Sequence, residues 1–583
     1  MIKNLIKSIK EYKKQTILTP IFVSVETIIE VLIPFFMAYL IDNGINKNDE
    51  KTILVVGILL CIAAIISLVF GILSGRSAAK ASAGFAKNLR KDMYYNVQNF
   101  SFTNIDKFST ASIVTRHTTD IAFVQMAFQM IIRVAVRAPL MLIFSLIMAF
   151  LVNIKLALIF LVAIPILGIG LYFIATKAHP IFEKTFTTYD KLNNIVQENV
   201  QGIRVVKSYV TEDKEIDKFY KISGDIYDGF AKAEKLVALN NPLMQFAMSV
   251  VIVLISLVGG KLIIGTSLTT GELTSLISYA MQILTSLMML SMILVMIMMS
   301  RASAERIVEI LVEKSTIHNN ENPVKEVKDG SITFKNVNFS YVDNKDKLCL
   351  KNVNIDIKSG ETIGIIGGTG SSKSTFVQLI PRLYDATEGE VLVGNGNVNV
   401  KDYDLKTLRN EVAMVLQKNV LFSGTIKENL RWGNENATDE EIIKACKQAQ
   451  ADEFVSSFPD GYDTYIEQGG TNVSGGQKQR LCIARALLKK PKILILDDST
   501  SAVDTKTDSL IRKAFKDEIP NTTKIIIAQR ISSVEDCDRI IVLDGGEING
   551  IGTHEELLKT NKIYEEVYSS QVKGGNDNEE SEQ

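Results

Sequence analysis

The sequence predicts a multi-domain chain, in which a six-helix, all-α membrane domain is followed by an α/β domain. Two observations support this fold class. Long apolar runs are confined to residues 1 to about 305, although 47% of the whole chain is hydrophobic. From Gly330 onwards, short β-branched runs alternate with helical stretches, which predicts a parallel sheet covered by helices; the runs are 332–334, 362–366, 412–416, 493–496, 524–528 and 540–543. We therefore expect a transmembrane domain over 1–305, a linker over 306–329, an α/β domain over 330–572 and a disordered tail over 573–583.

Length, charge and cysteine content limit the number of domains and the kinds of partner or metal site that we expect. A chain of 583 residues is too long for one ordinary domain. Its net charge of −1 gives no bulk argument for nucleic acid as a partner. The five cysteines show no CxxC spacing, so neither a zinc site nor a disulfide framework is indicated.

Six apolar segments of the first half are long enough to cross a bilayer, which takes about 20 residues each. They lie at about 16–42, 52–75, 130–152, 156–176, 242–264 and 273–299. The connections 76–129 and 177–241 are long and rich in Lys and Arg, whereas the others are short. Positive charge favours the cytoplasmic side. We therefore expect a multi-pass cell-membrane protein with both termini and the α/β domain in the cytoplasm.

The two long connections carry helical patterns without another apolar run long enough to cross. We expect the spanning helices to continue beyond the bilayer as long intracellular extensions, with tips near 101–112 and 208–217.

Four charged residues lie inside the predicted spans. Glu26 and Glu30 are four residues apart on the first span, and Arg133 and Arg137 are four apart on the third, so each pair shares a helix face. Two interpretations remain open. The charges form ion pairs or lie near headgroups, or they line a translocation cavity in which the glutamates favour cationic cargo.

A glycine-rich segment lies in the predicted α/β domain. Residues 364–375 (GIIGGTGSSKST) follow a predicted strand and precede a helix, which is the context of a phosphate-binding loop. Backbone N–H groups would cradle the phosphates of ATP, Lys373 would reach the β and γ phosphates, and Ser374 would ligate Mg²⁺. Ser372 stands where glycine is usual, and its Cβ would crowd the loop. The predicted nucleotide-binding residues here are Gly367, Gly368, Thr369, Gly370, Ser371, Ser372, Lys373, Ser374 and Thr375.

Residues 472–480 (NVSGGQKQR) complete a set of motifs that resembles the ATPase domain of ABC transporters. The six spans and their long extensions resemble the type IV exporters of that family, so the resemblance covers nearly the whole chain. It implies that Tyr341 stacks on adenine and that Gln417 reaches Mg²⁺ and the attacking water. It also implies that Asp497 binds Mg²⁺, directly or through water. The extension tips would be coupling helices that dock on ATPase domains.

The same resemblance implies that a second ATPase domain is needed. In the family, the signature at a helix start contacts the γ-phosphate held by the opposite subunit, and the D-loop crosses the same interface. The residues that match these roles are Ser474, Gly475, Gly476 and Gln477 in the signature and Asp504 in the D-loop.

Two residues at catalytic positions also depart from the family pattern. Asp498 stands where a glutamate usually polarises the attacking water, and Gln529 stands where a histidine is usual. Asp498 is one methylene shorter, so it would hold the water about 1 Å from the best position, and such a misplacement can cost about 10²-fold in rate. Gln529 can hydrogen-bond the γ-phosphate but cannot carry a positive charge. We expect this chain's own Walker site to bind ATP and hydrolyse it weakly.

This pattern resembles bacterial heterodimeric multidrug exporters. We expect an ATP-hydrolysing translocase in which a second, different half-transporter supplies the catalytic Glu and His. The resemblance suggests a hydrophobic or amphipathic compound such as a drug as cargo. The methionine-rich sixth span either accommodates such cargo or simply faces lipid and packs against its neighbours. Two alternatives remain: a homodimeric lipid or drug exporter with two slow sites, and a membrane regulator gated by ATP binding.

Overall fold

The computed structural model describes residues 1–342, 347–394, 398–499 and 501–579. It divides into two compact units. The first comprises Met1–Gln98 and Phe108–Glu313, and the second comprises Asn99–Lys107 and Lys314–Gln583. Within the described residues, six helices of the first unit are long and apolar enough to cross a membrane. The predicted fold class is therefore confirmed.

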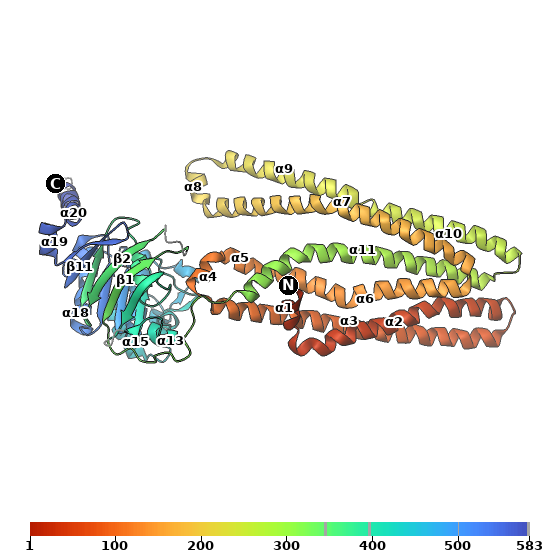
Figure 1. The fold of residues 1–583 in the computed structure, drawn as a ribbon, viewed down its shortest axis with the longest axis horizontal. Coiled ribbons are helices and arrows are strands. Elements are labelled where there is room, and N and C mark those ends of the chain that lie inside the picture. Colours follow the sequence, from red (N-terminus) through yellow and green to blue (C-terminus); the bar gives the residue numbers. More distant parts are fainter. Residues whose placement is uncertain (343–346, 395–397, 500, 580–583) are drawn as a thin grey trace. The chain divides into compact units, whose positions relative to one another are not determined.

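The first unit is all-α, as its long apolar runs predict. In Figure 1, α7 and α9 run side by side, with the short helix α8 at the tip of their hairpin. Its helices are α1 (Ile2–Lys7), α2 (Lys13–Tyr39), α3 (Glu50–Gln98), α5 (Thr110–Thr115), α6 (Ile121–Val152), α7 (Ile154–Gln201), α8 (Ile203–Ser208), α9 (Glu212–Val237), α10 (Asn240–Ile264) and α11 (Thr270–Val312).

Two boundaries in this unit differ from the expectation. Helix α11 continues to Val312, so the first turns of the expected linker are helical. The second tip lies at α8, earlier in the sequence than expected. Gly202 follows the end of α7, and acidic residues fill the first turn of α9. Acidic side chains stabilise a helix start, which explains why α9 begins already at Glu212.

The second unit contains two main sheets. A six-stranded sheet has the order β12-β11-β3-β10-β9-β6, and a four-stranded sheet has the order β2-β1-β4-β5. The strands are β1 (Ile332–Phe339), β2 (Leu350–Ile357), β3 (Thr362–Ile366), β4 (Glu388–Val393), β5 (Val398–Asn399), β6 (Val412–Val415), β7 (Gly424–Thr425), β8 (Tyr465–Ile466), β9 (Ile493–Asp497), β10 (Thr523–Ile527), β11 (Arg539–Asp544) and β12 (Glu547–Gly552).

Strand β1 does not join the parallel core in which its sequence placed it. It pairs antiparallel with β2 and β4. Its burial alternates over part of its length, which is the pattern of a strand with one covered face rather than two.

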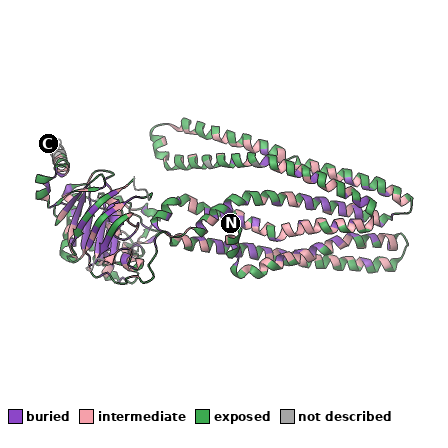
Figure 2. Ribbon diagram, in the orientation of Figure 1, coloured by how far each residue is buried: buried purple, intermediate pink, exposed green. Residues whose placement is uncertain are grey.

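The parallel strands of the larger sheet are covered on both faces. On β9, Ile493 and Ile495 belong to the apolar core that also contains β1, whereas Leu494 and Leu496 belong to the core under α17. Strands buried on both faces read as continuous apolar runs, which is why this strand was recognisable. Figure 2 shows the sheet strands largely buried, while the long helices of the first unit expose many residues.

The helices of the second unit include one from the first tip, α4, which lies between the two segments of the first unit in sequence. They are α4 (Phe102–Lys107), α12 (Lys373–Gln378), α13 (Leu405–Glu411), α14 (Ile426–Arg431), α15 (Asp439–Gln448), α16 (Asp452–Ser457), α17 (Gly475–Leu488), α18 (Thr505–Glu518), α19 (His554–Thr560) and α20 (Lys562–Glu579).

The expected disordered tail differs from the structure over residues 573–579, because α20 continues through them. Extending an existing helix adds one hydrogen bond per residue without a new nucleation cost, so a weakly helical sequence can follow a stable one. Residues 580–583 of that expected tail lie outside the described residues.

Candidate ATP site

Four segments far apart in sequence meet at the carboxyl edge of the larger sheet. Strands β3, β10, β9 and β6 are neighbours and run parallel. Gly367 follows β3, Asp498 follows β9, and Gln529 and Gln417 stand two residues beyond β10 and β6. Because parallel strands end at the same edge, this topology brings the predicted phosphate loop and the predicted catalytic residues together.

The phosphate loop runs from β3 to α12, and the side chain of Lys373 makes hydrogen bonds to other residues of the loop. The Nζ atom of Lys373 donates hydrogen bonds to the carbonyls of Gly367 (2.7 Å) and Gly368 (2.9 Å) and to Oγ of Ser371 (3.3 Å). Burial lowers the pKa of Lys373, while the nearby Asp497 carboxylate acts in the opposite direction. The ammonium is thus held over the loop, where phosphate oxygens could replace its carbonyl partners.

The loop and its neighbours fit a nucleotide with Mg²⁺. A Cβ at Gly367 would come within 2.2 Å of the Leu543 carbonyl oxygen, so the loop passes close to β11 there. Around Gly368 and Gly370 the same test finds no described atom within 4 Å, which leaves space for phosphates. The Ser374 hydroxyl donates to Oδ1 of Asp497 at 3.0 Å, so a hydroxyl and a carboxylate of the kind Mg²⁺ prefers are already side by side.

Ser372 carries a backbone conformation that explains why glycine is usual at its position. Its φ is +69° and its ψ is 27°, in the left-handed region. This region costs an L-residue with a Cβ roughly 1–2 kcal/mol. The energetic cost of a serine at this position therefore lies in its own backbone conformation.

The two departures from the family pattern touch each other. The Nε2 atom of Gln529 donates a hydrogen bond of 2.7 Å to Oδ2 of Asp498. The Nε2 atom of Gln417 lies 3.5 Å from the same oxygen. Asp498 is 9% exposed and its φ is +49°. Sequence reasoning identified both residues separately, but only the strand order makes them neighbours.

Tyr341 presents its ring beside the loop, as its predicted role requires. Its hydroxyl lies 3.0 Å from Oγ1 of Thr375 and donates to Oε1 of Gln378 at 3.3 Å. The rings of Phe339 and Tyr384 meet it nearly at right angles, at centroid distances of 4.8 and 5.1 Å. Tyr341 is 41% exposed, so it has surface available for an adenine.

Tyr384 also connects this site to α4, which lies in the first tip that the resemblance expects to dock on an ATPase domain; the residues that make this contact were not identified from the sequence. Its hydroxyl donates a 2.7 Å hydrogen bond to Oδ2 of Asp106, and its ring lies 5.9 Å from that of Phe102. Burial and the Asp106 carboxylate both raise the pKa of Tyr384, which keeps the phenol protonated. The first tip therefore contacts the aromatic group behind Tyr341. No local sequence signal marks either partner.

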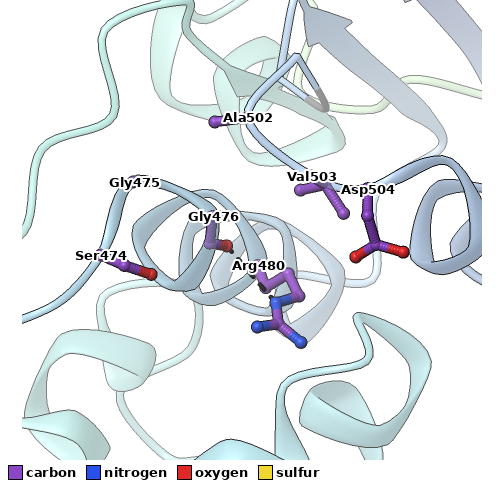
Figure 3. A pocket seen from close by; sticks show the side chains of 7 residues that line it. All are labelled: Ser474, Gly475, Gly476, Arg480, Ala502, Val503 and Asp504. Atoms are coloured by element: carbon purple, nitrogen blue, oxygen red, sulfur yellow. Dashed lines mark hydrogen bonds between the residues drawn. The ribbon is translucent and has the colours of Figure 1, made fainter. Parts of the chain in front are cut away.

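The signature residues lie on a different surface from the phosphate loop. Ser474 caps α17: its hydroxyl accepts from the N–H of Gln477, and the Gln477 side chain accepts from the N–H of Ser474. This helix start and the D-loop line one cavity of about 400 Å³. Figure 3 shows the side chains that line it. Its described lining residues are Ser474, Gly475, Gly476, Arg480, Ala502, Val503 and Asp504, none of which belongs to the phosphate loop.

Asp504 is fixed as the cap of α18. Its carboxylate accepts from the N–H of Thr507 at 2.9 Å, and that bond holds the pKa of the carboxyl below its ordinary value. A charged D-loop carboxylate and an open helix start thus share one cavity.

Comparison with known proteins supports both halves of this description. The model of the ABC transporter transmembrane region matches residues 16–288, and the ABC transporter model matches residues 350–501. An uncharacterized ABC transporter ATP-binding protein of Bacillus subtilis, YfiB, is 36% identical, and the alignment covers 97% of each chain. This chain belongs to the ABC transporter family.

Further relatives agree with this membership. A putative multidrug export ATP-binding/permease protein of Staphylococcus aureus is 32% identical to the transporter, over 98% of this chain and all of the relative. A solved structure of a bacterial Atm1-family ABC exporter with ATP bound shares the fold, with a TM-score of 0.84 at 23% identity and coverage of 96% and 99% of the two chains. The transporter is thus a half-transporter, with membrane and ATPase domains on one chain.

Three of the four charged residues predicted inside the transporter's spans, Glu26, Glu30 and Arg137, form ion pairs. Arg137 donates to Glu26 and to Glu30, each at 2.7 Å. Helix α3 makes room for this cluster with glycines: a Cβ at Gly71 would lie 3.1 Å from Glu26, and one at Gly75 would lie 3.6 Å from Arg133. The structure supports the ion-pair interpretation for Glu26, Glu30 and Arg137, and a role of the four residues in cargo binding stays a prediction.

Proposed function

We propose that the transporter is one half of an exporter with two different half-transporters, and that its own Walker site binds ATP with Mg²⁺ but hydrolyses ATP slowly. The hydrogen bond between Gln529 and Asp498 is the observation that carries this proposal. It places the two unusual residues on each other at the edge of the sheet where hydrolysis would take place.

Two properties of this pair slow hydrolysis. A general base needs a free oxygen within hydrogen-bond reach of the water, and Asp498 is short and has one oxygen engaged by the Gln529 amide. The amide is neutral at all relevant pH values, so it adds no positive charge toward a γ-phosphate. Mg²⁺, when bound with ATP, would neutralise phosphate charge, and Ser374 and Asp497 are the residues placed to hold it.

The signature supports a role in the partner's site. Ser474 is held at the start of α17 by a complete capping box, and the cavity before it is open. N–H groups at a helix start are suited to phosphate. In a head-to-tail pair, this chain would complete a site whose phosphate loop, catalytic glutamate and histidine belong to the other half-transporter.

The proposed cargo is a hydrophobic or amphipathic small molecule, such as a drug. A relative that matches the chain over its full length is named a putative multidrug exporter, which supports this class. The excess of Lys and Arg in 76–129 and 177–241 supports an ATPase domain and two termini in the cytoplasm.

The test is to extract the tagged transporter from its native membrane and identify by mass what co-purifies in equal amount. We expect a second half-transporter with Glu and His at the positions of Asp498 and Gln529. Recovery of this chain alone as a dimer would contradict the proposal and favour two slow sites. Nucleotide-dependent gating without uptake of dye into inverted vesicles would favour a regulator.

A further inference from the structure

The C-terminal helix α20 holds the segment that carries Gln529. The side-chain amide of Gln571, on α20, makes two hydrogen bonds to the main chain of that segment. Its Oε1 atom accepts from the N–H of Ile531 at 2.9 Å, and its Nε2 atom donates to the carbonyl of Gln529 at 2.8 Å. One amide thus fixes the backbone on both sides of Arg530, in the way that a neighbouring strand would.

Helix α20 is anchored firmly enough to act as a support. Tyr564 is fully buried, and its hydroxyl lies 2.7 Å from Nδ1 of His554 on α19. The His554 ring also meets the ring of Tyr568 at 5.3 Å. Val567 packs against the same apolar core, to which Ile531 and Tyr564 belong.

The position of Gln571 follows from this packing. Tyr564, Val567, Tyr568 and Gln571 are spaced at i, i+3, i+4 and i+7, so they share one face of the helix. The first three residues, which pack against α19 and the apolar core of the second unit, therefore direct the fourth toward the segment after β10. The amide lies at the exposed end of this stripe, in which Tyr564 is buried and Val567 and Tyr568 are half-buried, and it meets main-chain groups rather than side chains.

The contact continues into the candidate ATP site. The residue whose carbonyl Gln571 holds is the same residue whose side chain bonds Asp498 at 2.7 Å. A shift of the Gln529 backbone would move its amide relative to that carboxylate. Displacements of about 1 Å in such a constellation can change rates by about 10²-fold.

We propose that Gln571 is a positioning residue of the ATP site, through which the C-terminal helix fixes the main chain around Gln529 and thereby keeps its side chain on Asp498. The effect of Gln571 on ATP hydrolysis rests on the proposed function, in which this chain's own site is weak. The effect of Gln571 on the order of residues 529–531 is independent of that proposal, so the test can contradict either claim without the other.

The test measures amide hydrogen exchange of the full chain, reconstituted with its co-purifying partner or as the dimer that is recovered. In Gln571→Ala we expect the N–H of Ile531 to exchange about three- to tenfold faster, as befits the loss of one net hydrogen bond. The matched control is Ser570→Ala, because within the described part of the chain the Ser570 hydroxyl donates to the carbonyl of Val567 in its own helix. That variant should exchange as the wild type does.

A second variant separates the two bonds. Gln571→Glu keeps an acceptor for the N–H of Ile531 but has no donor for the carbonyl of Gln529. We expect Ile531 to stay protected in Gln571→Glu, while ATP turnover at this chain's site changes in kcat at an unchanged half-saturating ATP concentration.

Two results would overturn the inference. One is wild-type exchange at Ile531 in Gln571→Ala. The other is faster exchange that extends equally to strand β9, because Gln571 would then support the fold of the domain rather than this segment. Rapid hydrolysis at the wild-type site would contradict the proposed function and leave the exchange result standing.

Discussion

The Nε2 atom of Gln529 donates a 2.7 Å hydrogen bond to Oδ2 of Asp498, which joins the ends of two adjacent parallel strands, β10 and β9. The two residues at which the family resemblance implies glutamate and histidine therefore form one unit. Residues in direct contact respond non-additively to mutation, so the pair has to be changed together as well as singly.

Restoring both residues should activate this chain's own site. In a dimer whose partner site is disabled, we expect Asp498→Glu to raise hydrolysis about tenfold, and Asp498→Glu with Gln529→His to raise it about 10²-fold, because the base gains reach and the amide no longer engages it. Phosphate release measures the rate. Asp517→Glu, which lengthens an exposed carboxylate on α18, is the matched control. Equal rates in wild type and double variant would show that this pair is not the defect.

Removing the loop lysine should weaken ATP binding. Lys373→Ala deletes an ammonium that lies over the loop, and hydrogen bonds to charged groups contribute about 1.5–3 kcal/mol. We expect affinity to fall by about 10- to 100-fold in a titration with a fluorescent ATP analogue. Lys335→Ala, at an exposed position of β1, should bind as the wild type does. Unchanged binding by Lys373→Ala would place the nucleotide elsewhere.

Glycine at position 372 should stabilise the loop. Ser372→Gly relieves a left-handed backbone conformation that costs a residue with a Cβ roughly 1–2 kcal/mol. Part of this gain in stability is offset, because glycine makes the unfolded chain more flexible. We expect a small rise in the thermal midpoint and tighter binding of the ATP analogue. A lower midpoint and weaker binding would mean that the serine contributes a favourable contact.

The contact between Tyr384 and Asp106 should connect nucleotide binding to the first tip. We expect Tyr384→Phe and Asp106→Asn each to reduce stimulation of the ATPase by drugs, while basal nucleotide affinity changes little, because the hydrogen bond joins α4 to the ring behind Tyr341. A double-mutant cycle should give a coupling of about 0.5–3 kcal/mol. Strictly additive effects of the two substitutions on stimulation would mean that Tyr384 and Asp106 do not act through their hydrogen bond.

Much of the fold was predictable because membrane spans and buried parallel strands both read as continuous apolar runs. Strand β9 and its neighbours β3 and β10 were recognised for this reason. Strand β1 was assigned to the wrong sheet, because a short β-branched run does not specify its partners. The tip at α8 was placed too late, since helix ends depend on local capping that apolar periodicity does not report.

The sequence allowed the residues of the candidate site to be predicted, but not the contacts between them. Motif spacing identified Asp498 and Gln529, which are 31 positions apart, but strand order decides that they touch. Tyr384 and Gln571 carry no motif. Their roles depend on long-range hydrogen bonds to Asp106 and to the Gln529 main chain, for which a single sequence gives no signal.

The most direct test of the weak site is to identify the nucleotide on each subunit during turnover. The purified complex would be photolabelled with azido-ATP carrying the radiolabel at either the α or the γ phosphate, and the subunits would be separated. We predict that this chain retains both labels, whereas the partner retains the α label and loses the γ label. Loss of the γ label from this chain as fast as from its partner would contradict a weakly hydrolytic site.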